Sequence, residues 1–414
     1  MFYLIAERLG HSCSRELHAH FGDYEYEYKE LAPDEVGDFM QGGDWEGLNV
    51  TIPYKTEVMK YLDEISPEAQ AIGSVNTIVR RDGRKIGYNT DYYGFFAASN
   101  KAGILFGGRK VVILGTGGTS KTAQKVAADC GAAEIVVVSR TGENNYENIS
   151  RHADADILVN TTPVGMYPKT NEKPISLSIF RNLTGVIDVI YNPLYTNLIL
   201  EAQAAGIKNI GGLYMLTVQA AMASAFFTGV KPDRDAINGA YASLLRSRRN
   251  IVLVGMPGSG KSSIAAELGA RLGRRVLDTD AVIVERAGMP IPEIFEKYGE
   301  AHFRALERSA IEECSAEHGV IISCGGGAVL DRNNLPPLIR GGRIYLVLRE
   351  LDRLARDGRP LSAGADLTEM YRQRLPHYLA FSDASIENNS TIDAAVDKIL
   401  EDFNENFDSK RPKS

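Results

Sequence analysis

A complete phosphate-binding loop occupies residues 255–262, which read Gly-Met-Pro-Gly-Ser-Gly-Lys-Ser. In this pattern the backbone amides of the glycine-rich turn surround the β-phosphate, the lysine reaches the β and γ oxygens, and the serine hydroxyl ligates Mg²⁺. The loop follows the apolar run 250–254 and precedes a helical stretch, which is the context that the motif requires. We therefore expect ATP or GTP to bind here with Mg²⁺. The expected nucleotide contacts are Gly258, Ser259, Gly260, Lys261, Ser262 and Ser263.

A second glycine-rich loop follows the apolar run 110–114 and has the form Gly115-x-Gly117-x-x-Ser120. This is a dinucleotide-binding fingerprint in which serine replaces the third glycine. The next apolar run, 134–138, ends in Ser-Arg-Thr, so that an arginine stands where NAD sites usually carry an acidic residue. Because an arginine suits a 2'-phosphate, we favour NADP over NAD. The expected contacts are Gly115, Gly117, Gly118, Thr119, Ser120, Ser139, Arg140 and Thr141.

Polar clusters interrupt apolar sequence ahead of this loop, at residues 12–14, 49–55, 74–77 and 87–91. Hydroxyls, amides, one lysine and one aspartate suit a polyhydroxylated carboxylate as ligand. Hydride transfer to a ketone leaves an alkoxide that needs a proton, and Lys55 beside Asp91 could supply it. A surface ion pair is an equally open interpretation of these two residues.

Anion-binding side chains also follow the phosphate-binding loop. Asp278 and Asp280 end the next predicted strand, where one could hold Mg²⁺ and the other could orient an acceptor hydroxyl. Separated arginines at 304, 359 and 374 suit an anionic acceptor and a closing lid. For each arginine taken alone, a solvated surface role stays open.

Two strand–loop–helix units in one chain predict an α/β protein with two nucleotide-type domains in series. We expect an N-terminal α/β substrate domain at 1–100, with strands at 2–5, 24–29, 47–50 and 77–79, completed by a helical segment at 211–246. We expect a Rossmann domain at 101–210, and a P-loop domain of the nucleoside-monophosphate-kinase type with a parallel sheet at 250–402. Residues 403–414 are polar and predicted to form a frayed tail.

Composition excludes several classes of protein. The 414 residues are 44% hydrophobic and 24% charged, which is typical of a globular protein and not of a disordered chain. The net charge of −7 argues against nucleic acid as a partner, and no apolar run approaches the roughly 20 residues of a membrane helix. Four dispersed cysteines and the lack of a signal peptide predict the reducing cytoplasm.

Residues 1–246 resemble shikimate dehydrogenase, which reduces 3-dehydroshikimate with NADPH. The matching stretches are 11–14, 47–55, 73–77, 89–94, 115–118, 160–166, 191–196 and 212–219. The resemblance implies that Lys55 and Asp91 are the catalytic pair. It also implies a role in substrate binding for Ser12, Ser14, Thr51, Asn76 and Gln219, and a place beside the cofactor for Asn160, Thr161, Met166 and Gly212. One departure is Arg15, which follows Ser14 where the family usually has proline.

Residues 250–402 resemble shikimate kinase through the phosphate-binding loop and the later stretches 278–280, 303–304, 325–327, 359–361 and 374–378. The resemblance implies that shikimate is bound by Asp280, Arg304, Gly326, Gly327 and Arg374. It implies that Asp280 orients or deprotonates the 3-hydroxyl, while Lys261 and Arg359 neutralise charge on the phosphoryl group. Ser262 and Asp278 would hold Mg²⁺.

The two resemblances support each other, because the product of the first reaction is the acceptor of the second. We therefore predict a bifunctional enzyme of aromatic amino-acid precursor synthesis that uses NADP(H), ATP and Mg²⁺. Its expected partners are the small molecules 3-dehydroshikimate and shikimate, with no nucleic acid and no membrane, and a homodimer is left open. Alternatives are quinate or shikimate oxidation with NAD beside a different polyol kinase, and a ligand-sensing regulator built from degenerate enzyme domains.

Overall fold

The computed structural model describes residues 1–10, 12–354 and 367–407 of an α/β chain. The chain divides into two compact units. The first comprises residues 1–165, 173–191 and 198–244, and the second comprises residues 166–172, 192–197 and 245–414. Each unit is described by itself below.

The first unit begins with a mixed six-stranded sheet in the order β2-β1-β3-β5-β6-β4. Its elements are β1 (Phe2–Ala6), α1 (Ser14–His18), β2 (Tyr26–Glu30), α2 (Val36–Gly42), β3 (Gly47–Val50), η1 (Glu57–Tyr61), β4 (Glu64–Ile65), α3 (Pro67–Ile72), β5 (Thr77–Arg81), β6 (Arg84–Tyr88) and α4 (Thr90–Lys101). The four predicted strands are present within two residues of their expected ends. β6 was not predicted, although Asp82 (φ 50°) and Gly83 (φ 77°) form the two-residue turn of a hairpin.

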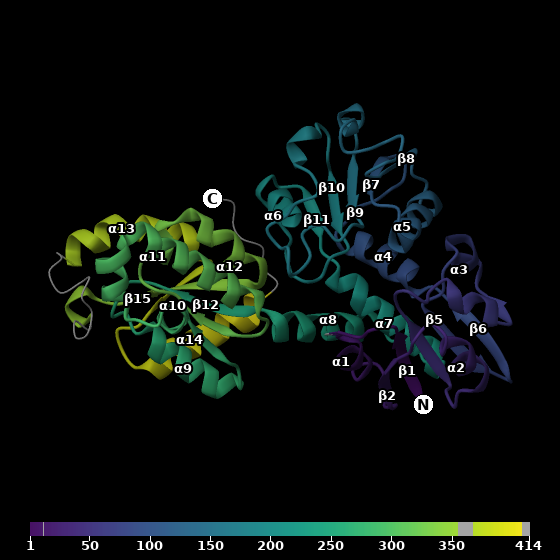
Figure 1. The fold of residues 1–414 in the computed structure, drawn as a ribbon, viewed down its shortest axis with the longest axis horizontal. Helices are drawn as coiled ribbons and strands as arrows, with labels where there is room; N and C mark the ends of the chain where they lie inside the picture. The colour runs from purple at the N-terminus through teal and green to yellow at the C-terminus, as the bar shows by residue number, and fades with distance from the viewer. Residues whose placement is uncertain (11, 355–366, 408–414) are drawn as a thin grey trace. The chain divides into compact units, whose positions relative to one another are not determined.

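A parallel five-stranded sheet in the order β11-β10-β9-β7-β8 follows. Its elements are β7 (Lys110–Leu114), α5 (Gly118–Asp129), β8 (Glu134–Val138), η2 (Ile149–His152), β9 (Ile157–Asn160), η3 (Leu177–Ile179), β10 (Gly185–Asp188), α6 (Asn197–Ala204) and β11 (Lys208–Ile210). Figure 1 shows β7, β9 and β10 side by side in the upper part of the view. Because the strands are parallel, the loops after β7 and β8 meet at one edge of the sheet.

The predicted helical segment at 211–246 is two helices, α7 (Leu213–Thr228) and α8 (Arg234–Arg248). Gly229 ends α7 in the left-handed conformation (φ 77°), and Pro232 lies in the short connection. α7 packs closely against α4 within the first unit. Only Arg249 separates α8 from the next strand.

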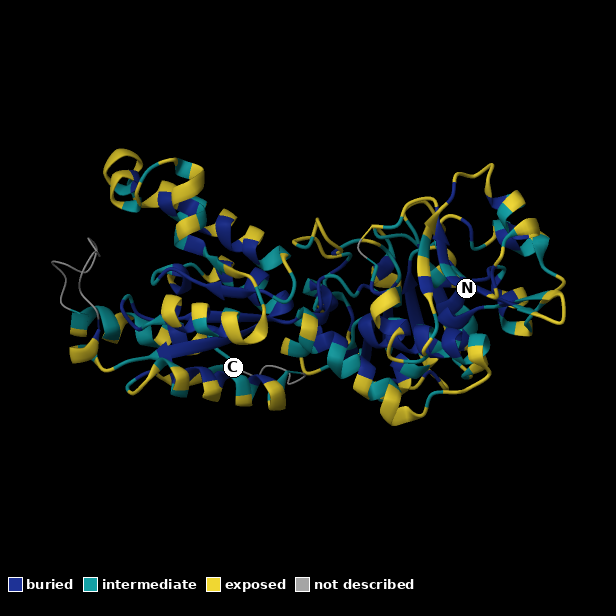
Figure 2. Cartoon of the chain, turned by 90° about the horizontal axis from the view of Figure 1, so that it is seen from below, coloured by how far each residue is buried: buried dark blue, intermediate teal, exposed yellow. Residues whose placement is uncertain are grey.

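The second unit contains a parallel sheet in the order β13-β14-β12-β15-β16. Its elements are β12 (Asn250–Val254), α9 (Lys261–Leu272), β13 (Val276–Asp278), α10 (Thr279–Ala287), α11 (Ile291–Ala316), β14 (Ile321–Ser323), η4 (Ala328–Leu330), η5 (Arg332–Asn334), α12 (Leu335–Gly341), β15 (Gly342–Leu348), η6 (Leu351–Arg353), α13 (Leu367–Phe381), β16 (Ala384–Glu387) and α14 (Ile392–Asn406). Figure 2 shows these strands buried and the outward faces of the helices exposed.

The predicted tail at 403–414 begins too early. α14 continues to Asn406, and the Phe403 side chain is only 2% exposed within the core beneath it. The reason is that Val396, Ile399 and Phe403 continue one apolar helical stripe. Residues 408–414 lie outside the described residues.

None of the helices in the described ranges combines the length and the apolar character that a membrane crossing needs.

Two candidate active sites

Lys55 and Asp91 form an ion pair, with 2.6 Å between Lys55 Nζ and Asp91 Oδ2. The Asp91 side chain is 7% exposed and that of Lys55 is 24% exposed. Asp91 lies in the first turn of α4, where the helix dipole favours a carboxylate, and the Asn89 side chain caps that helix. Burial on one side and access on the other therefore distinguish this pair from a surface ion pair.

The Asn76 side chain fixes the second oxygen of Asp91. Its Nδ2 donates to Asp91 Oδ1 at 2.9 Å. Its Oδ1 accepts from the backbone N–H of Thr90 at 2.7 Å and from the Thr90 hydroxyl at 3.1 Å. Because Oδ1 faces two donors on α4, the amide nitrogen must face the carboxylate.

Two serine hydroxyls lie together at the start of α1. Ser12 Oγ donates to Ser14 Oγ at 3.1 Å and accepts from the Ser14 backbone N–H at 3.2 Å. Two adjacent hydroxyls on one loop can donate to the two oxygens of one carboxylate.

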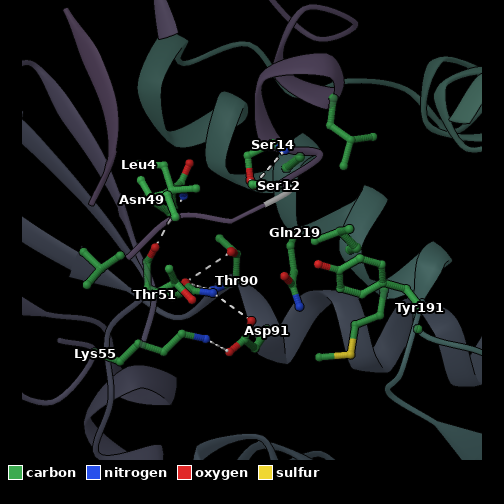
Figure 3. A pocket seen from close by; sticks show the side chains of 18 of the residues that line it. Leu4, Ser12, Ser14, Asn49, Thr51, Lys55, Thr90, Asp91, Tyr191 and Gln219 are labelled. Atoms are coloured by element: carbon green, nitrogen blue, oxygen red, sulfur yellow. Dashed lines mark hydrogen bonds and ion pairs between the residues drawn. The ribbon is translucent and has the colours of Figure 1, made fainter. Parts of the chain in front are cut away.

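One cavity of about 400 Å³ brings these groups together. Figure 3 shows the Lys55–Asp91 pair on one side of it and the Ser12–Ser14 pair on the other. All seven residues predicted to act on or bind the substrate line this cavity, namely Ser12, Ser14, Thr51, Lys55, Asn76, Asp91 and Gln219. Thr119 and Gly212, predicted to contact the cofactor, line it as well.

The dinucleotide loop has the open backbone that a pyrophosphate needs. An added Cβ at Gly117 or Gly118 would meet nothing within 4 Å, whereas one at Gly115 (φ 105°) would lie 2.8 Å from Thr161 Oγ1. The Gly115 N–H donates to the Val138 carbonyl at 2.8 Å, which places the loop beside the end of β8. The residues present therefore fit a dinucleotide at this edge of the sheet.

The remaining predicted cofactor residues divide into exposed and buried groups. Arg140 and Thr141 are exposed after β8, and Ser139 Oγ accepts from the Gly142 N–H at 2.8 Å. Ser120 is fully buried and accepts from Gln124, so its side chain packs α5 and is not available to a cofactor. Asn160 is also fully buried and donates to Asp188 at 3.1 Å. Met166 is 45% exposed and belongs to the second compact unit.

The phosphate-binding loop of the second unit is tightly formed. Lys261 begins α9, and its Nζ donates to the carbonyls of Gly255 at 2.9 Å and Met256 at 3.0 Å. Gly258 and Gly260 have φ of 85° and 94°, which lets the turn present its amides inward. Ser259 is buried, while Ser262 and Ser263 are exposed at the start of the helix.

The predicted Mg²⁺ ligands lie together beside this loop. Ser262 Oγ donates to Asp278 Oδ2 at 3.3 Å, and Asp278 Oδ1 caps α10 by accepting from the N–H of Asp280 at 3.0 Å. One hydroxyl and one carboxylate oxygen fit Mg²⁺, which usually keeps several waters and takes few protein ligands.

A second cavity of about 540 Å³ adjoins the loop. It is lined by the predicted acceptor residues that the structure describes, namely Asp280, Arg304, Gly326, Gly327 and Arg374, and by Lys261, Ser262 and Asp278. Arg374 Nη1 donates to the Gly326 carbonyl at 3.2 Å. Arg359 lies outside the described residues.

Comparisons with known proteins identify both halves. Residues 4–78 match the family model for the shikimate dehydrogenase substrate binding domain. Over 265 residues the chain is 36% identical to "Shikimate dehydrogenase (NADP(+))" of Clostridium perfringens, covering 59% of this chain and 98% of that relative. The chain belongs to the shikimate dehydrogenase family. Its α/β fold also resembles a chorismate mutase/shikimate 5-dehydrogenase fusion protein from Clostridium acetobutylicum (TM-score 0.56, 33% identity, 59% of this chain and 96% of that one).

The second half of this chain is a kinase domain. Residues 257–404 match the family model for shikimate kinase. The fold of the dehydrogenase half is also similar to that of a Thermus thermophilus shikimate 5-dehydrogenase in complex with NADP(H) and shikimate (TM-score 0.54, 30% identity, 58% of this chain and 98% of that one). Together these matches confirm the predicted α/β fold class and a bifunctional shikimate-pathway enzyme.

Sequence reasoning missed His18 in the dehydrogenase half, since no histidine was given a role. His18 lines the first cavity, stacks on Tyr26 with ring centroids 3.9 Å apart, and shares a 2.5 Å hydrogen bond between its Nδ1 and Tyr24 Oη. Burial lowers the pKa of His18 to about 3, although a hydrogen bond with Asn49 opposes this shift. The ring is therefore neutral near neutral pH.

Glu307 is the corresponding omission in the kinase half. It accepts from Arg304 Nη1 at 2.7 Å and is only 1% exposed. Burial raises the pKa of Glu307, and the neighbouring guanidinium opposes that shift. The spacing of Arg304 and Glu307, three residues apart on a predicted helix, was the available signal.

Proposed function

We propose that the first half reduces 3-dehydroshikimate to shikimate with NADPH, and that the second half phosphorylates shikimate at its 3-hydroxyl with MgATP. The observation that carries the proposal is the single cavity holding both the Lys55–Asp91 pair and the Ser12–Ser14 pair. In this proposal residues 1–100 and 211–246 hold the substrate, 101–210 hold the dinucleotide, and the unit from 250 to the end of α14 is the kinase.

The reduction needs one hydride and one proton. NADPH supplies the hydride when it is bound. As the ketone carbon gains the hydride, its oxygen becomes an alkoxide, and Lys55 Nζ donates the proton that converts it to a hydroxyl. Asp91 holds the ammonium toward the cavity, because Asn76 fixes the other oxygen of its carboxylate.

The remaining residues orient the substrate. Ser12 and Ser14 would donate to the carboxylate, while Thr51, Asn76 and Gln219 would contact the ring hydroxyls. The exposed Arg140 would pair with the 2'-phosphate of NADP, which supports NADP over NAD.

The phosphoryl transfer uses separate groups for the acceptor and the donor. Asp280 accepts the proton of the 3-hydroxyl while that oxygen bonds to the γ-phosphorus and the bond to the β-phosphate oxygen breaks. Lys261 and Arg359 would neutralise the transferring group, and Ser262 with Asp278 would hold Mg²⁺. Arg304 and Arg374 would hold the carboxylate of shikimate, and the amides of Gly326 and Gly327 would approach its ring.

A single reaction tests the proposal. Purified protein is mixed with 3-dehydroshikimate, NADPH and MgATP, and the products are read by mass spectrometry. Shikimate 3-phosphate is the expected product. Shikimate alone would reject the kinase assignment, and no conversion beside a working enzyme pair would favour a ligand-sensing regulator. Repeating the assay with quinate and NAD distinguishes the alternative oxidation. The cytoplasm as location and a homodimer as assembly also belong to this proposal.

A further inference from the structure

We infer that Tyr28 and Arg15 form a clamp that positions the Ser12 and Ser14 hydroxyls for the substrate carboxylate. Both are positioning residues, since neither lines the cavity. The inference rests on the proposed function, which gives the two serines a carboxylate to bind.

The Tyr28 hydroxyl joins both ends of the serine loop. Tyr28 Oη donates to the Ser12 carbonyl at 3.0 Å and accepts from the Arg15 backbone N–H at 3.0 Å. Tyr28 lies on β2, the edge strand of the sheet, so one rigid side chain ties the loop to a sheet. One hydroxyl thus spans the segment that contains both serines.

The clamp also completes the start of α1. The first backbone N–H groups of a helix have no partner within the helix, and Cys13 at the N-cap provides no side-chain acceptor. Ser12 Oγ accepts from the Ser14 N–H, and Tyr28 Oη accepts from the Arg15 N–H. Ser12 therefore has a positional role as well as its proposed contact with the carboxylate.

The Arg15 side chain holds Tyr28 from outside. Its guanidinium carbon lies 4.9 Å from the centre of the Tyr28 ring. Its Nε donates to the Tyr26 carbonyl at 3.2 Å, and its Nη2 pairs with Glu27 at 2.5 Å. These contacts lie along the exposed side of β2, where an edge strand has backbone groups free to accept.

The residue at position 15 determines whether the Tyr28 hydroxyl has a backbone N–H to accept from. Every residue except proline carries an N–H at this point of the helix, and proline is tolerated in the first turn. Arg15→Pro would remove the donor that Tyr28 accepts. The loss caused by Tyr28→Phe should therefore depend on which residue occupies position 15.

Steady-state kinetics test the clamp. Tyr28→Phe should raise KM for 3-dehydroshikimate about tenfold, which corresponds to about one hydrogen bond to a charged group. It should change kcat, KM for NADPH and the kinase constants less than about twofold. The matched control is Tyr3→Phe on the neighbouring strand β1, which should change none of them. An unchanged KM, or a fall in kcat alone, would overturn the inference.

Two further variants separate positioning from general loss of structure. Tyr28→Phe in an Arg15→Pro background should raise KM by less than about threefold, because only the bond to the Ser12 carbonyl remains to be lost. With shikimate methyl ester in the oxidation direction, Tyr28→Phe should raise KM by less than about threefold, since the neutral ester carbonyl accepts weaker hydrogen bonds than a carboxylate. An equal penalty in either case would contradict a clamp that acts on the carboxylate.

A substrate-free measurement keeps the inference separate from the proposed function. In hydrogen exchange, Tyr28→Phe should speed exchange of the Arg15 amide at least about tenfold while the α4 amides stay protected. If the wild type fails to reduce 3-dehydroshikimate, the proposed function fails, whatever the exchange shows. If exchange at Arg15 is unchanged, the clamp is rejected even in an active enzyme.

Discussion

Lys55 and Lys261 are both partly or largely buried lysines, but different partners hold them. Lys55 pairs with a carboxylate and lines a cavity, whereas Lys261 is a buried residue whose ammonium donates to two backbone carbonyls. The arrangement around Lys55 suits proton transfer, and the arrangement around Lys261 suits a cation that binds phosphate oxygens.

Lys55→Ala should lower the rate of 3-dehydroshikimate reduction by about 10²- to 10⁴-fold, the range for loss of a general acid. The reason is that the alkoxide formed from the ketone loses its proton donor. The measurement is NADPH oxidation, with kinase activity of the same sample as internal reference. Lys60→Ala, an exposed lysine nearby, is the control and should behave as wild type. Reduction at the wild-type rate by Lys55→Ala would refute the assigned role.

His18 should make the dehydrogenase half less stable in acid. Its folded pKa is about 3 against an ordinary value of 6.5, so only the unfolded chain gains a proton between these values. His18 therefore does not lower the free energy of unfolding above pH 6.5, but it lowers it progressively as the pH falls from 6.5 toward 3. At pH 5 this loss of stability is about 2 kcal/mol. The single tryptophan, Trp45, is buried in this half, so its fluorescence during urea unfolding reports the relevant transition.

The matched comparison for this effect is the slope of stability between pH 7.5 and pH 5. His18→Gln should reduce the loss of stability between these two pH values by about 2 kcal/mol. Equal slopes in wild type and His18→Gln would show that the buried ring does not control acid stability.

At the scale of elements, both sites form where parallel strands end. The loops after β7 and β8 converge on the dinucleotide site, and those after β12, β13 and β14 converge on the phosphate-binding loop. In the second unit the glycines after β14 provide the close approach. An added Cβ at Gly325 would overlap Asp280 Oδ1, and one at Gly327 would overlap the Arg304 guanidinium.

Gly327→Ala should therefore displace Arg304 and raise KM for shikimate about tenfold, since hydrogen bonds to charged groups contribute about 1.5–3 kcal/mol. KM for ATP should change less than about twofold. Kinase assays at varied shikimate and ATP measure both constants. Gly341→Ala is the control, because its added Cβ would meet only Asn250 Nδ2 at 3.8 Å. An unchanged KM for shikimate would remove Arg304 from the acceptor site.

At the scale of the whole molecule, two candidate sites share one chain. The residues that line each cavity belong to a single compact unit. The two activities should therefore be separable by substitution, with shikimate passing from one to the other through solution.

An equimolar mixture of Lys55→Ala and Lys261→Ala chains should convert 3-dehydroshikimate to shikimate 3-phosphate after a lag. At equal total protein its steady rate should be about half that of wild type, because each activity is carried by half of the chains and no effective concentration is gained within a chain. Lys261→Ala alone should stop at shikimate, and Lys55→Ala alone should form shikimate 3-phosphate only at its residual rate of reduction. A mixture far slower than half the wild-type rate would show transfer of shikimate within one chain.

Local residue patterns determined much of this protein. The loops at 115–120 and 255–262 and the strands that precede them could be predicted, because glycine turns and β-branched runs are set by neighbouring residues. The substrate-binding residues that line the first cavity were implied by the resemblance to shikimate dehydrogenase. Reasoning from local patterns predicted the wrong start for the tail, since the burial of Phe403 depends on a distant core.

Only the tertiary structure decided how the side chains are held. Asn76, the residue before β5, donates to Asp91 on α4. Glu307 accepts from Arg304 beside the second cavity, and Tyr28 joins the edge strand β2 to the serine loop. These partners are distant in sequence or depend on burial, and hydrogen bonds form wherever the fold brings a donor to an acceptor. The sequence determined which functional groups are present. The packing of sheets and helices determined how those groups are oriented for the reaction.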